Sequence, residues 1–185
     1  MLYVHHTSLS TIPQPLLRTI DALWTDAFGW QPVPDDEEVE VDPTADLFLL
    51  LSDDGRRVLA TAVVKRFDVQ FAGLVYPVQG ILNVVASVRS QGYGRAVMAA
   101  VREWLVTEGQ TGLGFAKRGV SEFYARCGYQ VERNLVERFR EACQDGTVRP
   151  HPDGDEDVFY VNDHGNLIWT ILNHSSEWAI VPEFW

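Results

Sequence analysis

The segment 83–98 (NVVASVRSQGYGRAVM) constrains this chain more than any other. Small and β-branched residues predict a strand, Gly92 and Gly94 predict a turn, and the next apolar residues recur at helical spacing. A strand–turn–helix brings unpaired backbone N–H groups and the positive end of a helix dipole to one place. Glycines let an anion approach those amides, and Arg89 and Arg95 add positive charge. The pattern predicts a phosphate or pyrophosphate site; the alternative is a plain surface turn.

Two common nucleotide-binding motifs do not describe this turn. A P-loop would need Lys-Ser or Lys-Thr after the glycine, and neither pair follows here. The G-x-G-x-x-G fingerprint is also excluded, because Ala96 and Val97 follow Gly94.

Charge narrows the choice of partners. The 185 residues carry 26 Asp+Glu against 15 Lys+Arg, a net charge of −11. Nucleic acid and anionic membrane surfaces are disfavoured, because their phosphates require Lys and Arg. Cationic partners are favoured, although solubility alone also explains an acidic chain. Hydrophobic residues make up 46 %, enough for a buried core.

The cysteines and the N-terminal segment indicate a cytoplasmic protein. Cys127 and Cys143 make no disulfide framework and lie in no metal-binding spacing, so no metal is expected. The first ten residues lack the basic start and apolar run of a signal peptide. No apolar stretch approaches the roughly 20 residues of a membrane span.

The hydrophobic pattern predicts one α+β domain over 1–185. Strands are expected at 2–6, 46–52, 56–70, 74–88, 111–116, 129–136, 158–161 and 167–172, with part of the acidic run 35–42 as an edge strand. Helices are expected from Pro13 to Gly29, after Gly94, and over 120–127. Gly80 inside the third long strand predicts a bulge or a close backbone approach.

Two motifs resemble the GNAT superfamily of N-acetyltransferases, which bind acetyl-CoA. The residues RSQGYG at 89–94 fit the superfamily signature Q/R-x-x-G-x-G/A, and FYARCGY at 123–129 is similar to its short helix with a tyrosine. The resemblance covers about 46–130. It implies a GNAT fold: a mixed, mostly antiparallel sheet with a splayed central strand, flanked by helices. The C-terminal strands, at about 131–185, would complete the substrate side.

A narrower resemblance points to the aminoglycoside 2′-N-acetyltransferases. It lies in KRFDVQFAG (65–73), in VQGI (78–81), in the acidic turn at 152–159, and in the C-terminal EW and EFW. Those enzymes end in a similar pattern and use the carboxylate of the terminal tryptophan in the substrate pocket. The resemblance implies a small cationic amine as the acceptor.

The superfamily resemblance also implies roles for individual residues. The backbone of Leu82, Asn83 and Val84 would bind the pantetheine arm, and a backbone N–H near Val84 would polarise the thioester carbonyl. The pyrophosphate would be held by the turn residues Arg89, Ser90, Gln91, Gly92, Tyr93 and Gly94. Tyr124 would protonate the departing CoA thiolate; the alternative is a tyrosine that merely packs in the core.

The general base does not follow from the motifs. The aminoglycoside enzymes use a strand glutamate, and the nearest residue here is Gln79, which cannot accept a proton. The replacements are the carboxylate of Trp185, then Glu183, then an acid of 35–42, with solvent as a further option. Substrate-binding candidates are Glu37, Gln79, Asp153, Asp155 and Glu183. Any of these acids could instead belong to a solvated charge run.

Three functions remain open. The first is an acetyl-CoA-dependent N-acetyltransferase that acts on a primary amine of a small cationic substrate. The second is an acyl-CoA-binding module without catalysis, favoured by the missing strand glutamate. The third is an acetyltransferase that acts on protein or peptide amines. The predicted antiparallel edges also allow a homodimer.

Overall fold

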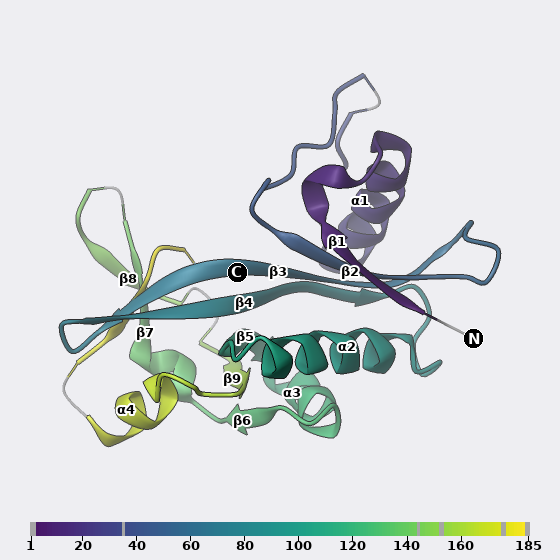
Figure 1. Cartoon of the computed structure of the whole chain (residues 1–185). Coiled ribbons are helices and arrows are strands. Elements are labelled where there is room, and N and C mark those ends of the chain that lie inside the picture. The colour runs from purple at the N-terminus through teal and green to yellow at the C-terminus, as the bar shows by residue number, and fades with distance from the viewer. Residues whose placement is uncertain (1–2, 35, 144, 152–153, 175–176, 184–185) are drawn as a thin grey trace. The chain divides into compact units, whose positions relative to one another are not determined.

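The structure, a computed structural model, describes residues 3–34, 36–143, 145–151, 154–174 and 177–183. Figure 1 shows its helices and strands. The chain divides into two compact units. The first comprises Met1–Lys65 and Leu82–Val101, and the second comprises Arg66–Ile81 and Arg102–Trp185. Strands β3 (Val58–Phe71) and β4 (Leu74–Ala86) and helix α2 (Tyr93–Thr107) each contribute to both units. The boundary therefore runs through regular elements and not through a linker.

The first unit packs a helix against an antiparallel sheet. Strand β1 (Val4–Ser8) pairs with β2 (Asp46–Leu51), and β2 pairs with the first part of β3. Helix α1 (Gln14–Phe28) ends at Gly29, whose φ of 70° is the left-handed conformation common after helices. The predicted N-terminal helix and its glycine stop are confirmed.

The core of the first unit follows from the spacing of apolar residues on α1. Leu17, Ile20 and Trp24 lie on one helical face and are buried. They share a core cluster with Leu47 and Leu49, which alternate on one face of β2. The apolar face of α1 therefore packs on the apolar face of β2.

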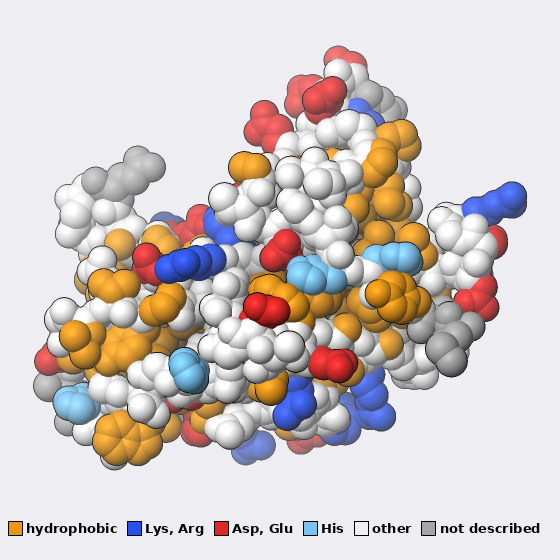
Figure 2. All heavy atoms as spheres, in the orientation of Figure 1, with side chains coloured by type: hydrophobic (Ala, Val, Ile, Leu, Met, Phe, Trp, Pro, Cys, Tyr) orange, Lys and Arg blue, Asp and Glu red, His pale blue; other side chains and the backbone are white. Residues whose placement is uncertain are grey.

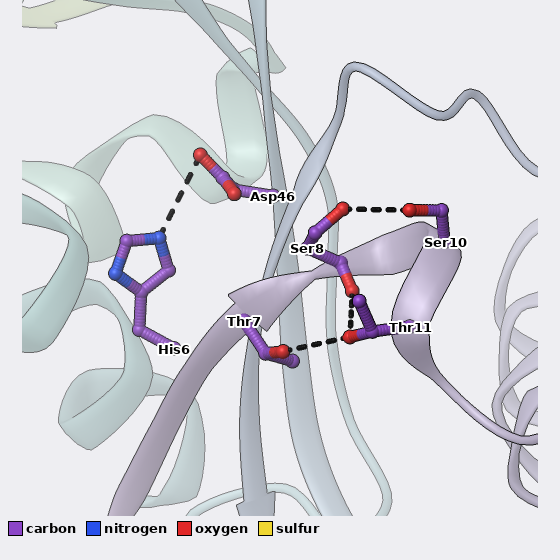
Figure 3. Close-up of polar contacts among 6 residues, drawn as sticks. All are labelled: His6, Thr7, Ser8, Ser10, Thr11 and Asp46. Atoms are coloured by element: carbon purple, nitrogen blue, oxygen red, sulfur yellow. Dashed lines mark hydrogen bonds and ion pairs between the residues drawn. The ribbon is translucent and has the colours of Figure 1, made fainter.

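Polar contacts fix the corner where β1 leads into the short helix η1 (Leu9–Thr11), as Figure 3 shows. The Thr11 hydroxyl donates to the carbonyl of Ser8 at 2.7 Å. His6 and Asp46, on neighbouring strands, bring Nε2 and Oδ2 to 3.6 Å. These groups are partly exposed, so they orient the chain more than they stabilise it.

The acidic run at 35–42 forms no strand among its described residues, and the edge strand predicted there is wrong. The side chain of Gln14 takes the place of a strand partner. Its Nε2 donates to the carbonyl of Val39 at 3.2 Å, and its Oε1 accepts the Val39 N–H at 3.1 Å. Because this pair satisfies the backbone locally and Val39 is buried against α1, the loop needs no sheet edge.

The long hairpins predicted after Asp46 are confirmed. Strands β2, β3 and β4 follow one another with turns in which Gly55, Ala72 and Gly73 have φ values of 68°, 51° and 75°. Within β4 the left-handed residue is Asn83, with a φ of 48°.

The second unit is a mixed, mostly antiparallel sheet with the strand order β6-β9-β5-β4-β3-β10-β7-β8. Its further strands are β5 (Gly112–Lys117), β6 (Gln130–Glu132), β7 (Phe139–Ala142), β8 (Val148–Pro150), β9 (Glu156–Val161) and β10 (Ala179–Val181). Strands β4 and β5 pair in parallel, as do β7 and β10. The α+β class predicted from the sequence is confirmed.

The helices of the second unit are α3 (Arg118–Arg126) and α4 (Leu167–Asn173). The short helix predicted at 120–127 is confirmed by α3, and Gly128 follows it with a φ of 88°. The strand predicted at 167–172 is wrong, because α4 occupies those residues. The carboxylate of Asp163 accepts the N–H groups of Ile168 and Trp169 at 3.2 and 3.1 Å, and so satisfies donors of the first helical turn.

The strand predicted at 129–136 is shorter than expected. Pairing stops with β6, after which Asn134 adopts a left-handed φ of 62° and helix η2 (Leu135–Arg138) begins. Strands β7, β8 and β10 had no strong sequence signal, since each has only three or four residues.

Candidate active site

The predicted phosphate-binding turn lies in the first unit, between the end of β4 and the start of α2. Ser87 fixes its beginning, because its N–H and its hydroxyl both contact the carbonyl of Leu59, at 2.9 and 3.1 Å. Ser90 and Gly92 have left-handed φ values of 63° and 81°. Left-handed residues in a turn help to aim backbone N–H groups to one side, which is a geometry that holds anions.

The side chains of the turn leave those amides accessible. Arg89, Ser90, Gln91 and Gly92 are exposed, and so is Arg95 on the first turn of α2. The remaining predicted turn residues, Tyr93 and Gly94, are half-buried. A Cβ on Gly92 would meet nothing within 4 Å, so glycine is required there by backbone conformation and not by space. Exposed arginines, open amides and a helix start fit a pyrophosphate group.

The predicted pantetheine segment lies on the same unit, directly before the turn. Leu82, Asn83 and Val84 are all half-buried on β4. The carbonyl of Asn83 accepts a hydrogen bond of 3.2 Å from the hydroxyl of Thr61 on β3. Trp24 of α1 in turn donates its indole N–H to that hydroxyl at 3.0 Å. Neither Thr61 nor Trp24 was predicted from the sequence as a functional residue. The available signal was one hydroxyl among the buried apolar residues of β3.

Tyr124 lies in the second unit, buried in a stack of aromatic rings. Its ring is parallel to that of Phe159, with centroids 3.7 Å apart, and it meets Phe123 and Tyr129 edge-on. Burial raises the pKa of Tyr124 above its usual value, and the negative charges of Cys127 and Glu156 add to the effect. The phenol is therefore protonated throughout the neutral range, as a proton donor must be.

The predicted substrate-binding residues are divided between the units. Glu37 is exposed in the first unit, on the loop between α1 and β2, where Figure 2 shows acidic side chains gathered. Gln79, Asp155 and Glu183 belong to the second unit. Gln79 is half-buried on β4, whereas Asp155 and Glu183 are exposed. Asp153 and Trp185 lie outside the described residues.

Asp155 does not act as an isolated acid. Its carboxylate lies 3.5 Å from Nε of Arg118, which also lies 4.0 Å from the buried carboxylate of Asp157. Arg118 and Asp157 line a hollow of about 420 Å³ beside α3, together with Arg133 and Asn134. This hollow contains none of the predicted site residues among those described.

A second hollow, of about 370 Å³, is lined by Arg140, His151 and Trp178. The guanidinium of Arg140 stacks over the Trp178 ring at 3.7 Å. Among the described residues, no group of three His, Cys, Asp or Glu side chains could hold a metal ion. Nor does the described part of the chain include a helix long and apolar enough to cross a membrane.

Comparison with known proteins decides the family. The model of the acetyltransferase (GNAT) family matches residues 16–129, which include most of α1, the turn and α3. The chain belongs to the GNAT family. The prediction of an N-acetyltransferase is thereby confirmed at the level of the family. No curated protein matches the sequence.

Solved structures show the GNAT fold at low sequence identity. Escherichia coli ElaA has a TM-score of 0.58 at 15 % identity, covering 86 % of this chain and 99 % of its own. An acyl-CoA N-acyltransferase from Pseudomonas aeruginosa has 0.54 at 16 %, with coverages of 86 % and 99 %. A probable N-acyltransferase from Enterococcus faecalis has 0.55 at 17 %, covering 76 % of this chain but only 33 % of its own.

Proposed function

We propose that this GNAT protein is an acetyl-CoA-dependent N-acetyltransferase that acetylates a primary amine of a small cationic substrate. The observation that carries the proposal is the turn at 87–92, which precedes α2 and contains the left-handed Ser90 and Gly92 and the exposed Arg89. Backbone N–H groups and a guanidinium there fit the pyrophosphate of CoA. Family membership makes acetyl-CoA the expected acyl donor.

The proposed reaction is a direct transfer. The neutral amine attacks the thioester carbon, a C–N bond forms, and the C–S bond breaks. The negative charge that develops on the carbonyl oxygen is stabilised by the N–H of Val84. The leaving sulfur takes the phenolic proton of Tyr124, while a base removes one proton from the attacking nitrogen. A tyrosine keeps its proton at neutral pH, and Tyr124, whose pKa burial raises further, does so too, so its phenol has a proton to give.

A carboxylate is the proposed proton acceptor. The carboxylate of Trp185 remains the first candidate, followed by Glu183 and the acids of the loop after α1. The loop acids support a cationic acceptor. Arg18 holds this loop through the carbonyls of Pro34 and Glu37, and the carboxylates of Asp36, Glu37, Glu38 and Glu40 stay exposed. An aminoglycoside-like amine is the specific substrate class proposed, with Asp153 and Asp155 as further contacts.

Gln79 favours a second candidate function. It is half-buried on β4, where a carboxylate would serve as base, and its side chain cannot accept a proton from an ammonium group. If neither another carboxylate nor solvent takes the proton, the protein would bind acyl-CoA without turnover. Acetylation of lysines in peptides is the remaining option, since an acidic loop also attracts Lys-rich chains.

The decisive experiment measures binding and turnover separately. Acetyl-CoA should raise the melting temperature of the protein, because a ligand that binds only the folded state stabilises it. Thiol release should then be followed over a panel of aminoglycosides, polyamines and Lys-containing peptides. No shift in Tm at millimolar acetyl-CoA would contradict the proposal. A shift without thiol release from any amine would favour the binding module.

The proposed enzyme acts as one catalytic domain in the cytoplasm. The shared strands β3 and β4 support one domain, with the strands after α3 completing the substrate side. The thiols Cys127 and Cys143 fit a reducing compartment. A homodimer is the assembly we propose to test, by light scattering at two protein concentrations.

A further inference from the structure

A chain of two hydrogen bonds connects α1 through β3 to the left-handed residue of β4. The indole N–H of Trp24 donates to Oγ1 of Thr61 at 3.0 Å, and this hydroxyl contacts the carbonyl oxygen of Asn83 at 3.2 Å. A carbonyl and an indole N–H have fixed roles, so Thr61 accepts from Trp24 and gives its single proton to Asn83. The direction of both bonds is therefore determined.

This chain of two hydrogen bonds, called the relay below, is buried, so Thr61 has no alternative partner in solvent. Thr61 is 0 % exposed and Trp24 is 7 % exposed, and both belong to the first unit together with Asn83. The neighbours of Thr61 on β3 include the buried Ala60 and Ala62. A hydroxyl in such a strand is costly unless it is hydrogen-bonded, and a valine would fill the same volume. The hydroxyl therefore has a use that packing does not explain.

The geometry of the peptide group between Asn83 and Val84 indicates what the hydroxyl does. A trans peptide is planar, and its C=O and N–H point to opposite sides. The carbonyl of Asn83 points to Thr61 on β3, so the N–H of Val84, in the same peptide, points away from β3. Asn83 itself has a φ of 48°, which interrupts the extended conformation of β4 at this peptide.

We propose that Thr61 is a positioning residue that orients the N–H of Val84 toward the thioester carbonyl, with Trp24 fixing the Thr61 hydroxyl. This inference rests on the proposed function, in which Val84 stabilises the negative charge on the carbonyl oxygen. A donor that is oriented before the reaction needs no reorganisation when the charge appears. Thr61 thus contributes to the rate without contacting acetyl-CoA.

The test compares Thr61→Val with Thr61→Ser, which keeps the hydroxyl. Thr61→Val should lower kcat for thiol release from acetyl-CoA by about 10- to 100-fold. The Kd for CoA should stay within about two-fold, because free CoA is a thiol and has no thioester carbonyl for the Val84 N–H to polarise. Thr61→Ser should recover kcat to within about three-fold of the wild type. A kcat of Thr61→Val that equals the wild-type value would overturn the proposal.

A buried threonine in the second unit provides the control. Thr111 donates its hydroxyl to the carbonyl of Asn162 at 2.9 Å and accepts the N–H of His164 at 3.1 Å. Thr111→Val should lower Tm, like Thr61→Val, but leave kcat unchanged. Equal losses of kcat in both variants would show that lost stability is the cause, and would also overturn the proposal.

Trp24→Phe covers the case in which Thr61→Val does not fold. It removes only the donor to Thr61, and kcat should fall about three- to ten-fold with the Kd for CoA unchanged; an unchanged kcat would count against the relay. The proposed function fails separately, if the wild type neither binds CoA nor releases thiol. If the wild type turns over and the Thr61 and Trp24 variants have the same kcat, the positioning role is overturned and the proposed function stands.

Discussion

The turn before α2 and the surroundings of Tyr124 are built in opposite ways. The turn is exposed, and the anion binding predicted for it depends on backbone N–H groups and the left-handed Ser90 and Gly92. Tyr124 is buried, and its position comes from side-chain packing on Phe159 at 3.7 Å. The turn belongs to the first unit and Tyr124 to the second.

The difference determines how each region responds to mutation. A site made of backbone groups tolerates most side chains but depends on φ at one or two residues. A site made of packed rings depends on the shape of its neighbours, because protein interiors are close-packed. Changes in the turn should therefore affect binding of CoA, and changes around Tyr124 should affect stability and the chemical step.

The largest effect is expected for Tyr124→Phe. Loss of the phenolic proton should lower kcat about 100-fold, while the Kd for CoA changes little. Tyr129→Phe is the matched control, because Tyr129 is also buried and burial also raises its pKa. Its kcat should stay near the wild-type value. Steady-state rates of thiol release measure both variants, and equal losses would remove Tyr124 from the mechanism.

The second-largest effect is expected for Gly114→Ala. Gly114 lies opposite Phe159 in the β5–β9 pair, and the Phe159 ring occupies the space that a Cβ would need. The ring must move, which should cost about 2 kcal/mol of unfolding free energy. Because Tyr124 stacks on this ring, kcat should fall about ten-fold as well.

The control for Gly114→Ala is Gly119→Ala on α3, where a Cβ meets nothing within 4 Å. This variant should be neutral or slightly more stable, since alanine favours a helix. Urea unfolding gives the free energies. A fully stable Gly114→Ala would mean that the aromatic stack adapts, and that packing around Tyr124 is looser than its geometry indicates.

Gly92→Ala should act on binding. A side chain at a left-handed φ of 81° costs about 1 kcal/mol. The exposed turn should relax in the free variant, and acetyl-CoA must then restore it, which corresponds to about five-fold in affinity. Gly55→Ala has the same strain, at a φ of 68°, on another turn of the first unit. Calorimetric titration should show weaker binding for Gly92→Ala only. Equal affinities for acetyl-CoA in the two variants would mean that the turn before α2 is not part of the CoA site.

The smallest effect is expected for Asp42→Asn, at the end of the acidic loop. Hydrogen bonds from Thr44, and then Lys65, lower the pKa of Asp42 to about 2. A lowered pKa stabilises the fold above the ordinary value of 3.8, and this gain is lost as pH falls toward 2. The side chain is 33 % exposed, so screening limits the gain to about 0.5 kcal/mol.

Urea unfolding at pH 7 and at pH 2 tests this sign. Asp42→Asn should be less stable than the wild type at pH 7 and equal to it at pH 2. Asp145→Asn is the matched comparison. Asp145 accepts the N–H and the hydroxyl of Thr147, as Asp42 does from Thr44, and its pKa is also lowered. A larger effect at pH 2 than at pH 7 would contradict the assignment.

Local patterns allowed much of the fold to be predicted. The strand–turn–helix, the hairpins and α3 all follow from glycines and from periodicity within a few residues. Errors arose where a distant or polar partner decided the outcome. Gln14 replaced a sheet edge at Val39, and Asp163 turned the β-prone residues of α4 into a helix. Neither partner is visible in a hydrophobic pattern.

The candidate site shows the same division. By itself the sequence determined the turn at 89–94 and the GNAT family, because glycine positions and charge near a helix start are local properties. Only the tertiary structure decided the role of Thr61, which lies 22 residues from the carbonyl it contacts. A buried hydroxyl acquires its function from the partner that folding brings to it, and no spacing along the chain specifies that partner.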